Sequence, residues 1–165
     1  MWPSFIIIIL KVAGLFLLWT LLVYLMHRLA HFRHRFNFLY HIHCYHHRID
    51  YLSEKRGFRW YHFFFYFGSF YESLDVWLMM TLPVIALFLW QPKYGIYILV
   101  FHYLYEVFLS ESQLDHNERI KGKVTRYFSW GTYHLGHHRN IHSNYSLMIT
   151  LWDSVFRTTQ QVVKN

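Results

Sequence analysis

The chain has 165 residues, which is enough for one domain. Hydrophobic residues make up 55% of it and charged residues only 15%, a composition that is apolar for a soluble domain and favours a membrane protein. The single cysteine, Cys44, excludes an internal disulfide framework. The net charge is +7 with histidine neutral, but the basic residues border apolar segments, as in the flanks of membrane helices. We therefore expect no nucleic-acid partner.

Residues 1–26 are predicted to form a transmembrane helix. From residue 4 onward the segment is apolar apart from Lys11, and it is long enough to cross a bilayer core of about 30 Å. A cleavable signal peptide is the weaker interpretation, because the apolar run is long and no small-residue cleavage site follows it. The run continues instead into His27 and His31 without a helix breaker.

Residues 27–61 are polar, basic and rich in histidine, with Asn37 and Gly57 as the expected breaks between short surface helices. Residues 62–109 are apolar again, and the turn signal Gln91-Pro92-Lys93 divides them. We expect this segment to be a helical hairpin that enters the membrane and returns, with a kink at Pro83.

Residues 110–165 form a second polar block, so the fold class is predicted to be all-α, with one membrane domain over residues 1–165. One span followed by a hairpin places both polar blocks on the same side of the membrane. Of the sixteen Lys and Arg residues, all but Lys11 and Lys93 lie in these blocks. The positive-inside rule assigns that side to the cytosol.

Three histidine boxes lie in the two polar blocks. Their spacing places the imidazoles of each box on one side of a helix. The members are His27 and His31; His43, His46 and His47; and His134, His137 and His138. A single box is often a pair of surface histidines, but the three together predict a metal centre. Gly136 lowers the helix propensity of the last box, and we expect it to allow the close approach of another element.

Eight imidazoles are too many for one ion and suit two. Nitrogen ligands without thiolates are typical of iron, zinc or copper. Structural zinc would recruit cysteines and needs only four ligands. Two metals beside a lipid phase indicate oxygen chemistry on an apolar substrate, for which an iron pair is suited.

These boxes resemble the membrane fatty acid hydroxylase/sterol desaturase superfamily. The resemblance adds His116, the histidine after the membrane hairpin, as a ninth ligand. It also covers the tail, where Asn144-Tyr145 and Leu151-Trp152-Asp153 through Thr158 are similar to the family's closing motif. Arg157 stands where the family usually has glycine, which is expected to alter the closing turn.

The resemblance implies a di-iron oxygenase that hydroxylates or desaturates a lipid, with zinc as a replacement metal. It also implies an external electron donor, such as a cytochrome b5-like protein or a ferredoxin, and a location in the endoplasmic reticulum or a bacterial inner membrane. The alternative is a metal-binding membrane protein without oxygenase activity, either a zinc carrier or a decayed relative.

Four further residues are candidates for supporting the metal ligands through hydrogen bonds. They are Glu111, Asp115, His142 and Asn144. Asp115 is expected to orient a ligand histidine. For Glu111 two roles stay open, as a carboxylate ligand or as a hydrogen-bond acceptor. Ser69-Phe70-Tyr71-Glu72 replaces an element that carries a histidine in many relatives.

Overall fold

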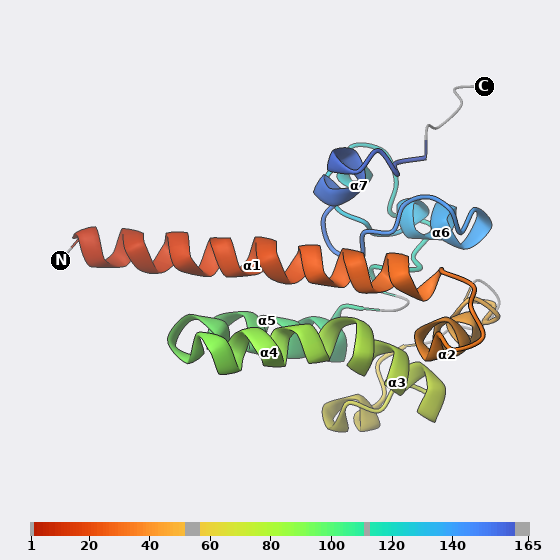
Figure 1. Ribbon diagram of the computed structural model, residues 1–165, viewed down its shortest axis with the longest axis horizontal. Coiled ribbons are helices and arrows are strands. Elements are labelled where there is room, and N and C mark those ends of the chain that lie inside the picture. The colour runs from red at the N-terminus through yellow and green to blue at the C-terminus, as the bar shows by residue number, and fades with distance from the viewer. Residues whose placement is uncertain (1, 52–56, 111–112, 161–165) are drawn as a thin grey trace.

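The computed structural model describes residues 2–51, 57–110 and 113–160. In these ranges the chain is helical and contains no strand, apart from two isolated β-bridges. Figure 1 shows a long N-terminal helix with a helical hairpin along one side of it and the C-terminal segment along the other. The described residues confirm the expected all-helical fold of an integral membrane protein.

Helix α1 (Trp2–Ala30) is the axis of the molecule and reaches the first histidine box. Its segment Phe5–Ala30 is one of two candidate membrane spans found among the described residues. Large apolar side chains in its first half are exposed, including Ile6 at 53% and Leu10 at 65%. Such exposure is expected of side chains that face lipid, and it would be an aggregation hazard in water.

The first arm of the hairpin begins at Phe70, inside the predicted segment 62–109. Helix α3 (Phe70–Val76), a π-helical turn η2 (Trp77–Thr81) and α4 (Leu82–Trp90) form one continuous arm, which is the second candidate span. Pro83 lacks an N–H, so a wider turn just before it accommodates the lost helical hydrogen bond. Helix α5 (Pro92–Phe108) returns antiparallel to α4.

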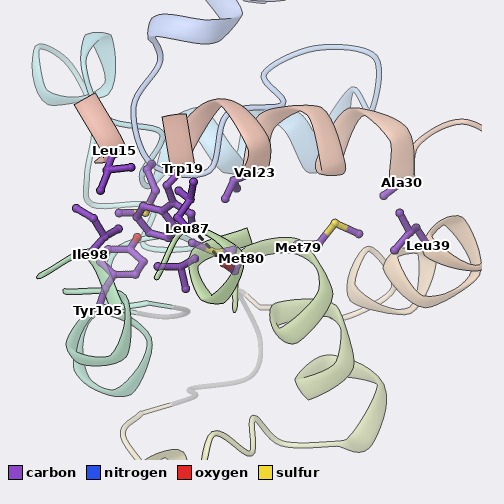
Figure 2. Packing of buried hydrophobic residues seen from close by; sticks show 12 residues of the cluster. Leu15, Trp19, Val23, Ala30, Leu39, Met79, Met80, Leu87, Ile98 and Tyr105 are labelled. Atoms are coloured by element: carbon purple, nitrogen blue, oxygen red, sulfur yellow. Dashed lines mark hydrogen bonds between the residues drawn. The ribbon is translucent and has the colours of Figure 1, made fainter. Parts of the chain in front are cut away.

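The two arms of the hairpin approach closely at Gly95. A Cβ atom at this position would lie 2.6 Å from the Cα of Phe88, so only glycine fits there. Figure 2 shows the core that the hairpin forms with α1, in which Leu15 and Trp19 face Leu87 and Ile98. The Trp19 indole also donates a hydrogen bond to the Met80 carbonyl at 3.1 Å. The first membrane helix is therefore fixed to the hairpin by packing and by a polar contact.

The remaining elements form a cap around the C-terminal half of α1. They are α2 (Phe38–His46), the 3-10 turns η1 (Trp60–Phe64) and η3 (Val124–Arg126), α6 (Thr132–Arg139) and α7 (Leu151–Val155). Asn37, an expected break, directly precedes α2. Its side-chain amide donates hydrogen bonds to the carbonyl of Leu29 in α1 and to that of Phe32 just after α1. This side chain couples the end of the membrane helix to the start of the second histidine box.

Arg157 lies in the closing turn, at the position where the resemblance led us to expect glycine. Arg157 has φ = +56°, in the left-handed region that glycine adopts without steric cost. The turn places Thr158 beside the Tyr24 hydroxyl of α1, at 3.0 Å. Arginine thus keeps the turn that glycine would form, at a conformational cost.

Candidate metal centre

Five histidines from three helices converge at the end of α1. His27 lies on α1 and His31 directly after it, His43 lies on α2 with His47 at its end, and His137 lies on α6. We call these residues the five-histidine group. The Nε2 atom of His31 lies 3.2 Å from that of His27, 3.1 Å from that of His43 and 2.9 Å from that of His137. The Nε2 atoms of His43 and His47 are 3.1 Å apart.

Four further histidines form a second cluster, the four-histidine group. Its members are His46 of α2, His116 of the loop before α6, and His134 and His138 of α6. The Nε2 atom of His138 lies 3.1 Å from that of His116 and 3.2 Å from that of His134. All nine histidines singled out in the sequence are thereby brought into two sets.

The spacing of these nitrogen atoms fits a bound metal. Two nitrogen ligands at about 2.1 Å from one ion and at right angles to each other lie about 3.0 Å apart. The Nε2 pairs described above span 2.9–3.2 Å. Within each group all ligand atoms lie within 4.8 Å of one another. Both groups therefore have the dimensions of a coordination shell.

The two groups are neighbours because α2 and α6 each contribute to both. His46 and His47 are consecutive but belong to different groups, as do His137 and His138. The ring centroids of His47 and His138 are 4.4 Å apart, across the boundary between the groups. The duplicated box thus supplies a pair of adjacent sites from two helices.

Hydrogen bonds hold three members of the five-histidine group with Nε2 directed inward. The Nδ1 atom of His27 lies 2.6 Å from the backbone carbonyl oxygen of Tyr145. The Nδ1 atom of His137 lies at the same distance from the backbone carbonyl oxygen of Ser143. Because a carbonyl only accepts, each Nδ1 carries the proton and each Nε2 presents a lone pair. That tautomer is the one a metal at Nε2 requires.

Asp75 forms a hydrogen bond with His43, the third histidine that is held in this way. The sequence alone did not identify Asp75 as a site residue. Its two carboxylate oxygens lie 3.0 Å and 3.1 Å from Nδ1 of His43, and both residues are buried. Asp75 lies on α3, one helical turn after Glu72. An acidic residue beside an apolar span is the signal that identifies it, because such residues are rare without a partner.

The four-histidine group is supported by an aromatic residue, Tyr51. Its hydroxyl lies 2.8 Å from Nδ1 of His46. Its ring stacks on His116 with the centroids 3.6 Å apart and the planes at 10°. One side chain therefore orients two members of this group.

The tail motif connects to the ligands through Asp153, which is fully buried. Its carboxylate accepts hydrogen bonds from the backbone amides of Tyr145 and Ser146, each at 2.8 Å. The hydroxyls of Tyr133 and Thr158 also donate to it, at 2.9 Å and 2.6 Å. Asp153 thereby places the Tyr145 carbonyl that binds His27, a role that the sequence motif alone did not reveal.

The electrostatics keep the imidazoles neutral and available as ligands. Burial, followed by the neighbouring His43, lowers the pKa of His31 to about 2. Burial likewise lowers the pKa of His137 to about 3, and that of His138, which also faces His116, to about 2. Burial is also the main cause of the lowered pKa values of His46, His47 and His134. Protons therefore compete weakly with a metal for these nitrogens.

The four supporting candidates lie in different places. Asp115 is close to the site and accepts a hydrogen bond from the Tyr105 hydroxyl. Asn144 instead joins the tail to α6: its amide donates to the Tyr133 carbonyl, and its oxygen accepts from the Gln160 amide. His142 is exposed, and its backbone amide donates to Asn140. Glu111 lies outside the described residues.

Gly136 has the surroundings that the sequence indicated. A Cβ atom at this position would lie 3.2 Å from the Asn144 side chain and 3.3 Å from that of Gln160. These distances are tighter than ordinary van der Waals contact, so the tail packs directly against the last histidine box. The small residue therefore allows the tail to close over α6.

A cavity of about 70 Å³ adjoins the two groups, and we call it the metal-side cavity. Apolar side chains of the hairpin, including Met79 and Met80, form part of its wall. Its histidines are His43, His46, His116 and His134, and its carboxylates are Glu72, Asp75, Glu106 and Asp115. It is a buried space where a reacting group can meet the metal ligands.

A comparison with protein families gives one match. The model described as fatty acid hydroxylase matches residues 12–158. No curated protein and no solved structure matches the chain. The match covers the end of α1, all nine histidines and the tail motif, and it confirms the resemblance inferred from the boxes.

Proposed function

Because the chain belongs to the fatty acid hydroxylase family, we propose that it is a membrane-bound non-haem di-iron oxygenase. It hydroxylates or desaturates a lipid, with O2 as oxidant and electrons from an external carrier. The observation that carries this proposal is the convergence of nine imidazoles in two adjacent groups, with no cysteine in either. Iron is the metal that such nitrogen ligands suit for oxygen chemistry, and zinc is a plausible replacement during expression.

The residues of the chain have three tasks in this reaction. The nine histidines hold two ions, and bound iron supplies the redox chemistry that activates dioxygen for attack on a C–H bond. Asp75, Tyr51 and the carbonyls of Tyr145 and Ser143 fix the ligand rings. The apolar wall of the metal-side cavity excludes bulk water and accepts an alkyl chain or ring.

We place the histidine groups on the cytosolic side of the endoplasmic reticulum or of a bacterial inner membrane. The support is the concentration of Lys and Arg in the two polar blocks. The cap that carries these blocks lies around the C-terminal half of α1, and Lys93, in the first turn of α5, lies at the opposite end of the hairpin. A lipid substrate reaches the metal-side cavity from the bilayer in this arrangement.

The experiment that tests the function combines lipid analysis with metal analysis. Lipids from cells with the wild-type chain are compared by mass spectrometry with lipids from cells that carry His31→Ala. The matched control is His41→Ala, because His41 is exposed on α2 and its ring lies near the Arg35 carbonyl.

We expect hydroxylated or desaturated lipids with the wild type and with His41→Ala, and none with His31→Ala. We also expect the purified wild type to contain iron and to consume oxygen under a chemical reductant. An iron-loaded wild type that consumes no oxygen and changes no lipid would favour a metal-binding protein without oxygenase activity.

The external donor is proposed to be an acidic electron carrier that docks on the basic surface of the cap. Lys121 and Lys123 are exposed before η3 in the loop that leads to α6. Opposite charges steer such encounters and raise the association rate. The charge reversals Lys121→Glu and Lys123→Glu should slow turnover with the carrier but not with a small chemical reductant.

The matched control is Lys93→Glu, because Lys93 is exposed at the other end of the hairpin. It should leave both rates unchanged. Equal rates of the cap variants and the wild type with the carrier would contradict the docking surface.

A further inference from the structure

Glu106 is a buried acid in the returning arm of the hairpin. It lies near the end of α5 and is 4% exposed. One helical turn earlier on the same helix, Nδ1 of His102 lies 3.7 Å from the Glu106 carboxylate, and Nε2 of His102 lies 2.9 Å from the Thr81 hydroxyl. Ionisable residues in membrane segments are costly and usually serve a function.

Glu106 also lines two cavities at once. The first is the metal-side cavity, and the second is a small space of about 10 Å³. Exposed residues line the second cavity, two of them small or polar (Gly57 and Gln113) and two aromatic (Phe58 and Phe108), and His62 lines it as well. Ser110 lines both cavities as well. Glu106 and Ser110 therefore lie between the metal-side cavity and a space that reaches the protein surface.

Both spaces can hold water. A buried water needs roughly 10–15 Å³ and two to four polar partners. The small cavity is at the limit for one molecule, and its polar partners are Glu106, Ser110 and His62. The metal-side cavity has room for several waters among its carboxylates. A short chain of water molecules can therefore reach Glu106 from either side.

The proposed reaction requires such a supply of protons. Hydroxylation of a C–H bond inserts one oxygen atom of O2 into that bond and releases the other as water. The balance requires two electrons, which come from the external carrier, and two protons, which must come from the aqueous phase. This inference rests on the proposed function, because a protein that does not reduce oxygen needs no such supply.

We propose that Glu106 carries protons from the aqueous surface to the metal-side cavity. Its carboxylate takes a proton from water in the small cavity and releases it to water in the metal-side cavity. The other acids of the metal-side cavity do not line the small cavity. Two of them have other partners, because Asp75 accepts a hydrogen bond from His43 and Asp115 accepts one from Tyr105. Among the described residues, Glu106 is the acid that lines both spaces.

The test uses the full chain, loaded with iron in lipid nanodiscs and supplied with a chemical reductant. Oxygen uptake is measured in H2O and in D2O for the wild type, Glu106→Gln, Glu106→Asp and the control Glu118→Gln, and iron is counted in each. Without added substrate, oxygen is reduced to water or peroxide, and both products consume protons.

We expect Glu106→Gln to retain two irons, to consume oxygen at least about 10-fold more slowly and to show a larger solvent isotope effect. Glu106→Asp should restore part of the rate, because it restores a carboxyl group. Glu118→Gln should behave as wild type, because Glu118 is exposed.

Four results would overturn the proposal. Loss of iron from Glu106→Gln would make Glu106 a structural or metal-binding residue. An unchanged rate, or a slow rate with an unchanged isotope effect and no recovery in Glu106→Asp, would exclude proton transfer through it. A wild type that takes up no oxygen would instead overturn the proposed function, and the role of Glu106 with it.

Discussion

The five-histidine group and the four-histidine group contain the same kind of side chain but are held differently. In the first group, His27 and His137 donate to backbone carbonyls and His43 to the Asp75 carboxylate. In the second, the Tyr51 hydroxyl contacts His46, and His116 comes from a loop. The first group thus combines cap residues with supports from the membrane arms, His27 on α1 and Asp75 on α3, whereas all members of the second group and its support Tyr51 come from the cap and its loops.

The cavity shows the same asymmetry. Three members of the four-histidine group line the metal-side cavity, but only His43 of the five-histidine group does. A bound ion would have fewer open positions with five nitrogen ligands than with four. We therefore expect the five-histidine group to be the tighter metal site and the four-histidine group to leave more room for a further ligand.

The largest effect is expected when the five-histidine group loses a ligand. His137→Ala removes a fully buried imidazole whose Nε2 lies 2.9 Å from that of His31. We expect the bound metal to fall from two ions to one or none per chain, with oxygen uptake abolished. Element analysis and oxygen uptake measure both quantities. Activity that survives in His137→Ala would refute the site as described.

Asp75→Asn should weaken the five-histidine group selectively. The amide is nearly isosteric but cannot carry the negative charge that supports the His43 N–H, and loss of such a partner costs about 10-fold to 100-fold in metal affinity. Competition with a chelator measures the two affinities separately, with Glu118→Gln as the exposed control. Equal weakening of both sites would contradict the distinction between the groups.

Acid should destabilise the metal-free protein through both groups. The folded pKa values of His31, His137 and His138 lie at about 2 to 3, below the value near 6.5 of an unfolded histidine. The unfolded chain therefore binds more protons below about pH 6.5, and stability falls as the pH falls. The midpoint of thermal unfolding should be nearly constant above pH 7 and should decrease steeply below pH 6.

The two groups can be compared in the same titration. His137→Ala and His138→Ala should each reduce the steepness of the acid loss, because each removes one buried imidazole that resists protonation. A midpoint that stays constant down to pH 4 in the metal-free wild type would show that these histidines are not buried as described.

The smallest effect is expected from Tyr51→Phe. The change removes the hydroxyl that contacts His46 but keeps the ring that stacks on His116. Loss of one hydrogen bond of this kind is worth about 1 kcal/mol, which corresponds to a decrease of roughly 5-fold in metal affinity at the four-histidine group. Competition with a chelator measures this decrease in metal affinity. A larger loss at the five-histidine group would reverse the comparison.

The sequence predicted the parts of this fold that depend on local spacing. The apolar run up to His27, the turn at Gln91-Pro92-Lys93 and the boxes on helices follow from periodicity and turn residues, and the structure contains all three. The first arm begins at Phe70, within the predicted segment 62–109, and the π-helical turn before Pro83 is a detail that the sequence did not predict.

The supports of the ligands were not predictable in the same way. Asp75 is 32 residues from His43 in the sequence, and no spacing rule relates an acid on one helix to a histidine on another. The same holds for Asp153, which acts on His27 through the Tyr145 carbonyl. Such pairs arise from the packing of distant elements, so they are visible only in three dimensions.

The most direct test is the number of metal ions in the purified wild-type chain, determined by element analysis together with X-ray absorption at the metal edge. We predict two irons per chain, with nitrogen or oxygen neighbours at about 2.1 Å and no sulfur neighbour. A single ion per chain after full loading, or a sulfur ligand from Cys44, would contradict the two histidine groups as a pair of metal sites.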